Sequence, residues 1–198
     1  MDSAGLSRRQ MMLAAAGTGG AVLLTHGTAA PAHAAGSHGR TRWIGDWPEL
    51  LKNAAVEAVP AAVEEARRGR RPFGAVLVDR ASGRVLVREG NASEGGDQTA
   101  HAEMNVLRSA AARRVPVAGQ LLVSTAEPCP MCAGALLWSR VGAIACGTSI
   151  ARLAAYGVPQ IDIPLTALAS HSPYPSPALA LGLRADLTDP LYRDFDAW

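Results

Sequence analysis

The chain has 198 residues, of which 48% are hydrophobic, and a formal net charge of +2 at pH 7. This length and composition suit one globular domain with its own hydrophobic core and leave little room for a second domain. The positive balance is small and comes almost entirely from arginine, because Lys52 is the only lysine. Overall charge therefore does not indicate a nucleic-acid partner.

The N-terminal stretch differs in composition from the rest of the chain. Arg8 and Arg9 are adjacent, and the apolar, Ala/Gly-rich run that follows at 11–24 is too short to span a membrane. Small residues at Ala32 and Ala34 then provide the pattern that precedes a signal cleavage site. This order is typical of an export signal and resembles the twin-arginine type.

The predicted organisation is a signal peptide at 1–34, a linker at 35–46 and one domain at 47–198. Cleavage near Ala35 would leave 17 basic and 16 acidic residues of the original 19 and 17, so the mature chain would be nearly neutral. We expect an exported protein, secreted or held in the cell envelope, with no membrane span after processing. If the segment is instead a frayed N-terminus, the protein would stay in the cytoplasm.

From Trp47 onward the sequence alternates helical and strand patterns. A helical repeat of apolar residues runs from Trp47 to Gly69, and Pro60 is expected to bend it. Further elements are predicted as strands at 73–79 and 84–90 joined by a hairpin, a helix at 101–114, a strand at 120–125, a helix at 131–140, a strand at 143–148, a proline-rich loop at 170–177 and a helix at 188–198 with Thr188 or Asp189 as its cap. Strands alternating with helices predict an α/β sheet covered on both faces.

Two of the three cysteines, Cys129 and Cys132, form a C-x-x-C pair. Disulfides, redox pairs, structural metal sites and catalytic metal sites all use this spacing, so the spacing alone does not choose between them. Export favours a disulfide, but a bridge within this pair would close too short a loop to stabilise the fold much. Cys146, in the predicted strand at 143–148, is expected to be a small buried residue.

A second motif, His-x-Glu at His101 and Glu103, begins the helix that precedes the cysteine pair. Both helices follow strands of one sheet, so their N-termini can meet at its edge, where the helix dipole favours thiolates. One imidazole and two thiolates, with water in the fourth position, are the ligands of a catalytic zinc site. We therefore predict Zn²⁺ bound by His101, Cys129 and Cys132, with Glu103 as the catalytic base.

Three stretches carry a family resemblance: PFGAV at 72–76, TAHAE at 99–103 and EPCPMCAGA at 127–135. They resemble the cytidine deaminase-like superfamily of zinc deaminases and, within it, the guanine deaminase and tRNA adenosine deaminase branch. The resemblance covers 47–198 and implies a three-layer α/β/α fold with a mixed five-stranded sheet, usually in a homodimer. It also implies a hydrolytic deaminase in which Glu103 serves as base and then as acid.

The resemblance suggests four residues that contact the substrate. Asn91 matches the asparagine that holds the substrate ring, although it could be a simple turn residue after a strand. Phe73 and Trp138 would stack on the base or belong to the core. Asp162 is the one acidic residue at 149–164, where guanine deaminases read the purine edge, but it could instead cap the following helix.

The predicted substrate is a small free base or nucleoside, and a guanine-type purine is preferred. Export would separate the enzyme from cytoplasmic tRNA, and a nearly neutral chain offers few contacts to phosphate, so nucleic acid is not an expected partner. The alternatives are cytosine or cytidine deamination, tRNA adenosine deamination and, in another class, a zinc-binding interaction protein without catalysis.

Overall fold

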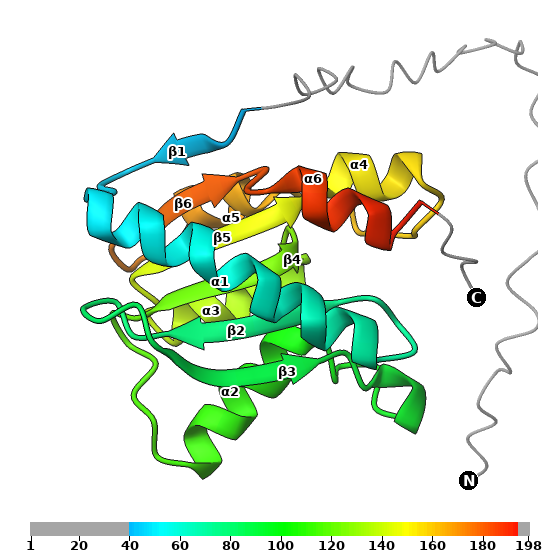
Figure 1. Ribbon diagram of the computed structural model, residues 1–198, viewed down its shortest axis with the longest axis horizontal. Coiled ribbons are helices and arrows are strands. Elements are labelled where there is room, and N and C mark those ends of the chain that lie inside the picture. The colour runs from blue at the N-terminus through cyan, green and yellow to red at the C-terminus, as the bar shows by residue number, and fades with distance from the viewer. Residues whose placement is uncertain (1–39, 194–198) are drawn as a thin grey trace, which may run out of the picture. The chain divides into compact units, whose positions relative to one another are not determined.

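The structure is a computed structural model that describes residues 40–193 (Figure 1). Residues 1–39, which include the predicted signal peptide at 1–34, and residues 194–198 lie outside the described residues. In chain order the elements are β1 (Arg42–Ile44), α1 (Glu49–Arg68), β2 (Gly74–Val78), β3 (Val85–Gly90), η1 (Ser93–Gly95), α2 (Ala102–Ala112), β4 (Leu121–Ala126), α3 (Pro130–Trp138), β5 (Ala143–Thr148), α4 (Ile150–Ala155), α5 (Leu165–Ser170), β6 (Ala178–Leu181), α6 (Ala185–Thr188) and η2 (Asp189–Leu191). No helix in the described part is both long enough and apolar enough to cross a membrane.

One mixed sheet organises the domain, with strand order β1-β6-β5-β4-β2-β3. The central strands β4, β5 and β6 are parallel, whereas β2 runs antiparallel to both β3 and β4. The predicted α/β class with a mixed sheet between helices is confirmed, but the described sheet has six strands instead of five. Because the central strands are parallel, their carboxyl ends lie at the same edge of the sheet, and the loops that follow them gather there.

The additional edge strand, β1, lies within the segment that was predicted to be a linker at 35–46. It pairs antiparallel with β6 through Trp43 and Ala180, so the folded domain begins before Trp47. Trp47 reinforces this pairing because its indole N–H lies 3.1 Å from the carbonyl oxygen of Leu179 in β6. A strand of three residues has no internal periodicity, so only its distant partner reveals it.

Helices cover both faces of the sheet (Figure 1). The long helix α1 packs on one face, against Val76 and Val78 of β2 and the equivalent side of the central strands. The other face, which includes Ala75 and Leu77, packs against α2, α3 and α5. Every residue of β4 and of β5 is buried, as expected for strands with a helix layer on each side.

The predicted elements up to residue 148 are all present, with ends shifted by no more than two residues. Helix α1 continues through Pro60, which is exposed and therefore sits on its solvent side. The predicted helix at 188–198 is wrong in the described part, because α6 ends at Thr188 and only a short 3-10 turn follows. Pro190 in that turn has no N–H with which to extend an α-helix.

Candidate active site

The two sequence motifs meet where α2 and α3 begin. His101 is the N-cap of α2, Cys129 is the N-cap of α3, and Cys132 lies in the first turn of α3. The His101 Nδ1 atom is 3.6 Å from Cys129 Sγ and 3.7 Å from Cys132 Sγ. The structure therefore brings together the three side chains that the sequence predicted as metal ligands.

The spacing of these three atoms fits a zinc ion. Zinc bonds of about 2.05 Å to nitrogen and about 2.3 Å to sulfur, at a tetrahedral angle, require a nitrogen to sulfur separation of about 3.6 Å. The observed separations match this value, and all three ligand atoms lie within 4.8 Å of one another. A set of one imidazole and two thiolates selects zinc and leaves a fourth position open.

The cysteines are free thiols in this structure, including the buried Cys146 of β5. Hydrogen bonding from Cys132, aided by His101, lowers the pKa of Cys129 to about 4, so this thiolate is available to a cation. The same hydrogen bond, together with burial, raises the pKa of Cys132. This thiol therefore keeps its proton until a metal ion binds and displaces it. The placement of Cys146 as a small buried strand residue is confirmed.

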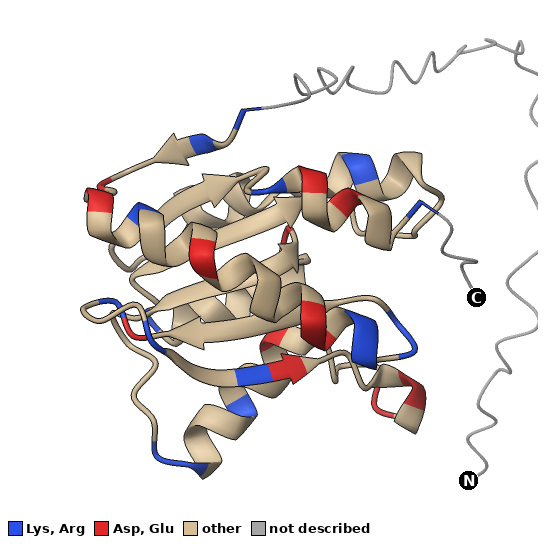
Figure 2. Cartoon of the chain, in the orientation of Figure 1, with Lys and Arg blue, Asp and Glu red and all other residues tan. Residues whose placement is uncertain are grey.

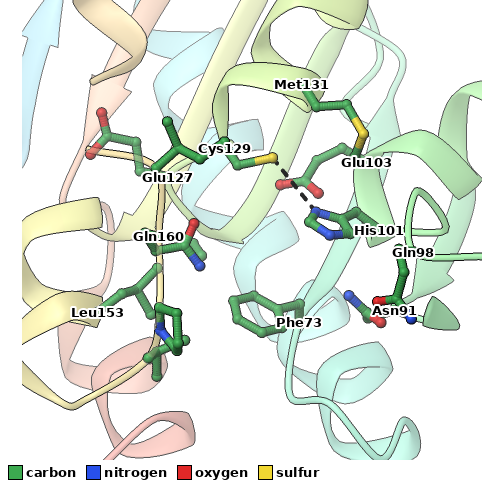
Figure 3. Close-up of a pocket in the computed structure, with 14 residues that line it drawn as sticks. Phe73, Asn91, Gln98, His101, Glu103, Glu127, Cys129, Met131, Leu153 and Gln160 are labelled. Atoms are coloured by element: carbon green, nitrogen blue, oxygen red, sulfur yellow. Dashed lines mark hydrogen bonds between the residues drawn. The ribbon is translucent and has the colours of Figure 1, made fainter. Parts of the chain in front are cut away.

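Glu103 lies beside the metal ligands but is not one of them. It is only 6% exposed, and Ser124 Oγ donates a hydrogen bond of 2.9 Å to its Oε1 atom. Burial raises the pKa of Glu103 above its usual range, so the carboxyl holds a proton more readily than an exposed one. Because His101 is the N-cap and departs from the helix, both side chains reach the same site (Figure 3).

A cavity of about 470 Å³ opens onto His101, Glu103 and Cys129. Two of the predicted substrate-binding residues, Phe73 and Asn91, line it. The other lining residues are ones that the sequence reasoning missed: Gln98, Ala126, Glu127, Met131, Leu153, Val158, Pro159, Gln160 and Ile161. Most of the wall is apolar, and its polar groups gather around the metal ligands and at Gln160.

Asn91 has the contacts of a turn residue and also lines the cavity. Its Oδ1 atom accepts hydrogen bonds from the backbone N–H of Ser93 (2.9 Å) and from Ser93 Oγ (2.8 Å), which makes it a turn residue. Its amide nitrogen points toward the cavity and can donate to a ligand (Figure 3). Phe73 extends into the same space and packs on the buried Tyr192, with ring centroids 5.1 Å apart.

Trp138 and Asp162 are not among the residues that line this cavity, and their contacts with a substrate stay a prediction. Trp138 ends α3, is 72% exposed and packs edge-on against Tyr174, because its position faces away from the strand ends. Asp162 is exposed, whereas its neighbours Gln160 and Ile161 line the cavity. The N-cap position of the following helix, α5, is occupied by Pro164.

Gln98 and Gln160 carry the signals that could have revealed them. Gln98 stands in the polar loop just before His101, and its closeness in sequence to a predicted metal ligand makes it a candidate to line the site. Gln160 lies in the 149–164 stretch, where the family resemblance indicates an acidic residue. A neutral amide there both donates and accepts hydrogen bonds, so it can bind a base as well as a carboxylate can.

Comparison with known proteins identifies the family. A family model described as the "Cytidine and deoxycytidylate deaminase zinc-binding region" matches residues 48–148. The chain belongs to this family. With its His/Cys/Cys site, it is a zinc-dependent deaminase.

Relatives within the family differ in substrate. The chain is 38% identical over 138 residues to a tRNA(Ile)-lysidine synthase from Deinococcus radiodurans. The matched stretch covers 61% of this chain and 24% of that protein. A structure from a study of A-to-I editing by tRNA:A34 deaminases is 31% identical, with a TM-score of 0.56, over 68% of this chain and 98% of that one. A guanine deaminase from Nitrosomonas europaea is 27% identical, with a TM-score of 0.55, over 78% of this chain and 87% of that one.

Proposed function

We propose that this deaminase converts a free guanine-type purine to the oxo-purine and releases ammonia. The observation that carries the proposal is the chemistry of the cavity: among the described residues, its lining contains neither lysine nor arginine. A site for a nucleotide or for RNA normally carries cations that bind phosphate. An apolar cavity with a few neutral amides suits an uncharged base.

The arrangement of the polar groups supports a flat, hydrogen-bonding ring. Phe73 offers an aromatic face against which a base can stack, and Asn91 and Gln160 face the cavity from opposite sides (Figure 3). An amide on each side can pair with the N–H and C=O groups at the two edges of a purine. A ring held in this way would present its amine-bearing carbon to the metal ligands.

Glu103 supplies the proton transfers of the proposed reaction. Zinc, when bound, activates a water molecule for attack on the ring carbon that carries the amine. The Glu103 carboxylate accepts the first proton of that water and donates it to the adjacent ring nitrogen, and it then accepts the proton of the added hydroxyl and donates it to the departing amine. A carbon–oxygen bond forms, the carbon–nitrogen bond breaks and ammonia leaves. Ser124 holds one carboxyl oxygen, so the other faces the reacting groups.

The charge around the cavity supports a small substrate over tRNA. Two arginines at and just after the C-terminal end of α1 have acidic neighbours: Arg68 Nη1 lies 2.8 Å from Glu65, and Arg70 Nε lies 3.0 Å from Glu94. Paired arginines contribute less to binding a phosphate backbone than unpaired ones. The likeness to the guanine deaminase from Nitrosomonas europaea is consistent with a free purine.

We further propose that the protein is exported through its twin-arginine-type segment and forms a homodimer. The proposal of export rests on the order of charged, apolar and small residues at 1–34. The proposal of a dimer rests on the family resemblance, and sedimentation of the mature chain tests it directly.

A substrate panel tests the proposed function. The zinc-loaded mature chain would be incubated with guanine, adenine, cytosine, their nucleosides and a tRNA anticodon stem-loop, and ammonia release would be measured for each. We expect guanine to give the highest kcat/KM. A faster reaction with cytosine or cytidine would reject the purine assignment and keep the zinc chemistry, whereas preference for the stem-loop would reject the small-substrate assignment.

A further inference from the structure

The carboxylate of Glu127 connects two short helices that lie far apart from it in sequence. Glu127 directly follows β4, precedes the metal ligand Cys129 by two residues and is only 8% exposed. Its Oε2 atom accepts a hydrogen bond from the backbone N–H of Ile150 (3.1 Å), and its Oε1 atom accepts one from Leu165 (2.9 Å). These residues begin α4 and α5, so one side chain holds the starts of both helices.

The chain between these two attachment points forms one side of the cavity. We call residues 150–165 the wall segment, and its lining residues are Leu153, Val158, Pro159, Gln160 and Ile161. Leu153 and Gln160 lie across the cavity from His101 and Asn91 (Figure 3). Because Glu127 binds both ends of the wall segment, it ties this wall to the loop that carries Cys129.

Glu127 is not arranged for proton transfer. Both of its oxygens already accept hydrogen bonds from backbone N–H groups, and its carboxylate points away from His101 and Cys129 (Figure 3). We propose that Glu127 is a positioning residue, which fixes the wall segment relative to the metal ligands and so holds the base in reach of Glu103. This inference rests on the proposed function, since it requires a substrate bound against that wall.

The two ends of the wall segment depend on Glu127 to different degrees. Helix α4 has a cap of its own, because Ser149 Oγ accepts from the backbone N–H of Arg152 (3.2 Å), and Arg152 also lies 3.5 Å from Asp189. Helix α5 begins after Pro164, whose side chain gives no capping hydrogen bond. Loss of Glu127 should therefore loosen the α5 end more than the α4 end.

Glu127→Gln tests the proposal, with Glu57→Gln on the exposed side of α1 as the matched control. The glutamine keeps the size but places an NH₂ group against one backbone N–H, so only one attachment remains. We expect zinc content equal to wild type and kcat/KM for the best substrate lower by about a hundredfold, the effect of a misplacement of about 1 Å. The pH dependence of kcat/KM should keep its shape, because Glu127 carries no proton in the reaction.

Hydrogen exchange of the wall segment provides a readout that needs no substrate. Peptides from 158–165 should exchange faster in Glu127→Gln than in the control, and those from α4 should change less. Glu127→Asp is the second variant, for use if Glu127→Gln does not fold. It keeps the charge but is one methylene shorter, so it should also lose one attachment and much of the activity.

Two results would overturn the proposal: exchange in both Glu127 variants equal to that of the control, or kcat/KM unchanged in Glu127→Asp. An altered pH profile would instead make Glu127 a proton carrier. If wild type deaminates no compound in the panel, the proposed function fails, and the exchange experiment alone decides whether Glu127 fixes the wall segment.

Discussion

Two buried carboxyl groups flank the metal ligands and differ in their partners. One oxygen of Glu103 accepts a hydrogen bond from the hydroxyl of Ser124, whereas both oxygens of Glu127 accept hydrogen bonds from backbone N–H groups. A group that moves protons must reach the reacting atoms, and a group that positions a wall must not be free to leave it. The partners of each carboxyl therefore support the proposed catalytic role of Glu103 and the proposed positioning role of Glu127.

Glu103→Gln should separate metal binding from turnover. The variant keeps the size of the side chain and can still accept a hydrogen bond from Ser124, but it cannot accept the proton of a water molecule. We expect about one zinc ion per chain, as in wild type, and turnover lower by about a thousandfold. Metal analysis and ammonia release would be measured on the same sample. Loss of zinc would instead identify Glu103 as a ligand.

The three cysteines should differ in reactivity once zinc is removed. Because its pKa is lowered to about 4, Cys129 should react first with iodoacetamide at neutral pH in the chelated protein. Burial raises the pKa of the Cys146 thiol, so this residue should react only after unfolding. Peptide mass spectrometry would locate the modified residues.

Zinc should protect Cys129 from this alkylation, since a coordinated thiolate is no longer a free nucleophile. Equal labelling of Cys129 with and without zinc would contradict the assigned ligand set. Labelling of Cys146 in the native protein would contradict its buried position in β5.

At the scale of elements, the contact of α1 with β2 depends on a glycine. A Cβ atom at Gly74 would overlap the carbonyl oxygen of Ala62 and the backbone nitrogen of Ala66 in α1. Gly74→Ala should therefore push α1 from the sheet and lower the free energy of unfolding by about 1–3 kcal/mol. Chemical denaturation of the metal-loaded protein measures this change.

Gly134 in α3 is the matched control for that substitution, because a Cβ atom there meets nothing within 4 Å. Alanine is favoured over glycine inside a helix, so Gly134→Ala should leave stability unchanged or raise it by up to about 1 kcal/mol. Equal destabilisation by both substitutions would show that the close approach of α1 to Gly74 does not matter.

The elements that the sequence predicted are those with a local signal. Helix α1 has apolar residues at helical spacing, and the two central strands β4 and β5 are apolar runs bounded by polar residues. The missed elements are short: β1 has three residues, β6 has four, and α4 and α5 have six each. Their stability comes from partners distant in sequence, which periodicity does not reveal.

The same distinction applies to the site. His101, Glu103, Cys129 and Cys132 were predictable because ligand chemistry restricts both the residue types and their spacing. The wall segment was not, because its place in the cavity depends on hydrogen bonds to Glu127. The exposed position of Trp138 was not predictable either, because an aromatic residue near a site is equally compatible with the outside of its helix.

For the whole molecule, the N-terminal segment predicts processing during export. When the full chain is expressed in a bacterium with twin-arginine translocation, the protein should be found outside the cytoplasm in a cleaved form whose N-terminus lies near Ala35. The described fold begins only with β1 at Arg42, so this cleavage would leave every strand intact. Mass spectrometry of the exported protein measures the new N-terminus.

Replacing both Arg8 and Arg9 by lysine gives the control for export, since the charge is kept while the arginine pair is lost. This variant should accumulate as the uncleaved chain in the cytoplasm. Export and cleavage that do not change in this variant would contradict the twin-arginine assignment.

The most direct test of the account is the origin of the oxygen in the product. The zinc-loaded protein would be incubated in water enriched in oxygen-18 with the best substrate of the panel, and the product and ammonia would be quantified by mass spectrometry and a coupled assay. Hydrolytic deamination predicts one oxygen-18 atom in each product molecule and one ammonia released with it. No ammonia from any base, nucleoside or stem-loop, or a product whose oxygen is unlabelled, would contradict the assignment of this site as a hydrolytic deaminase.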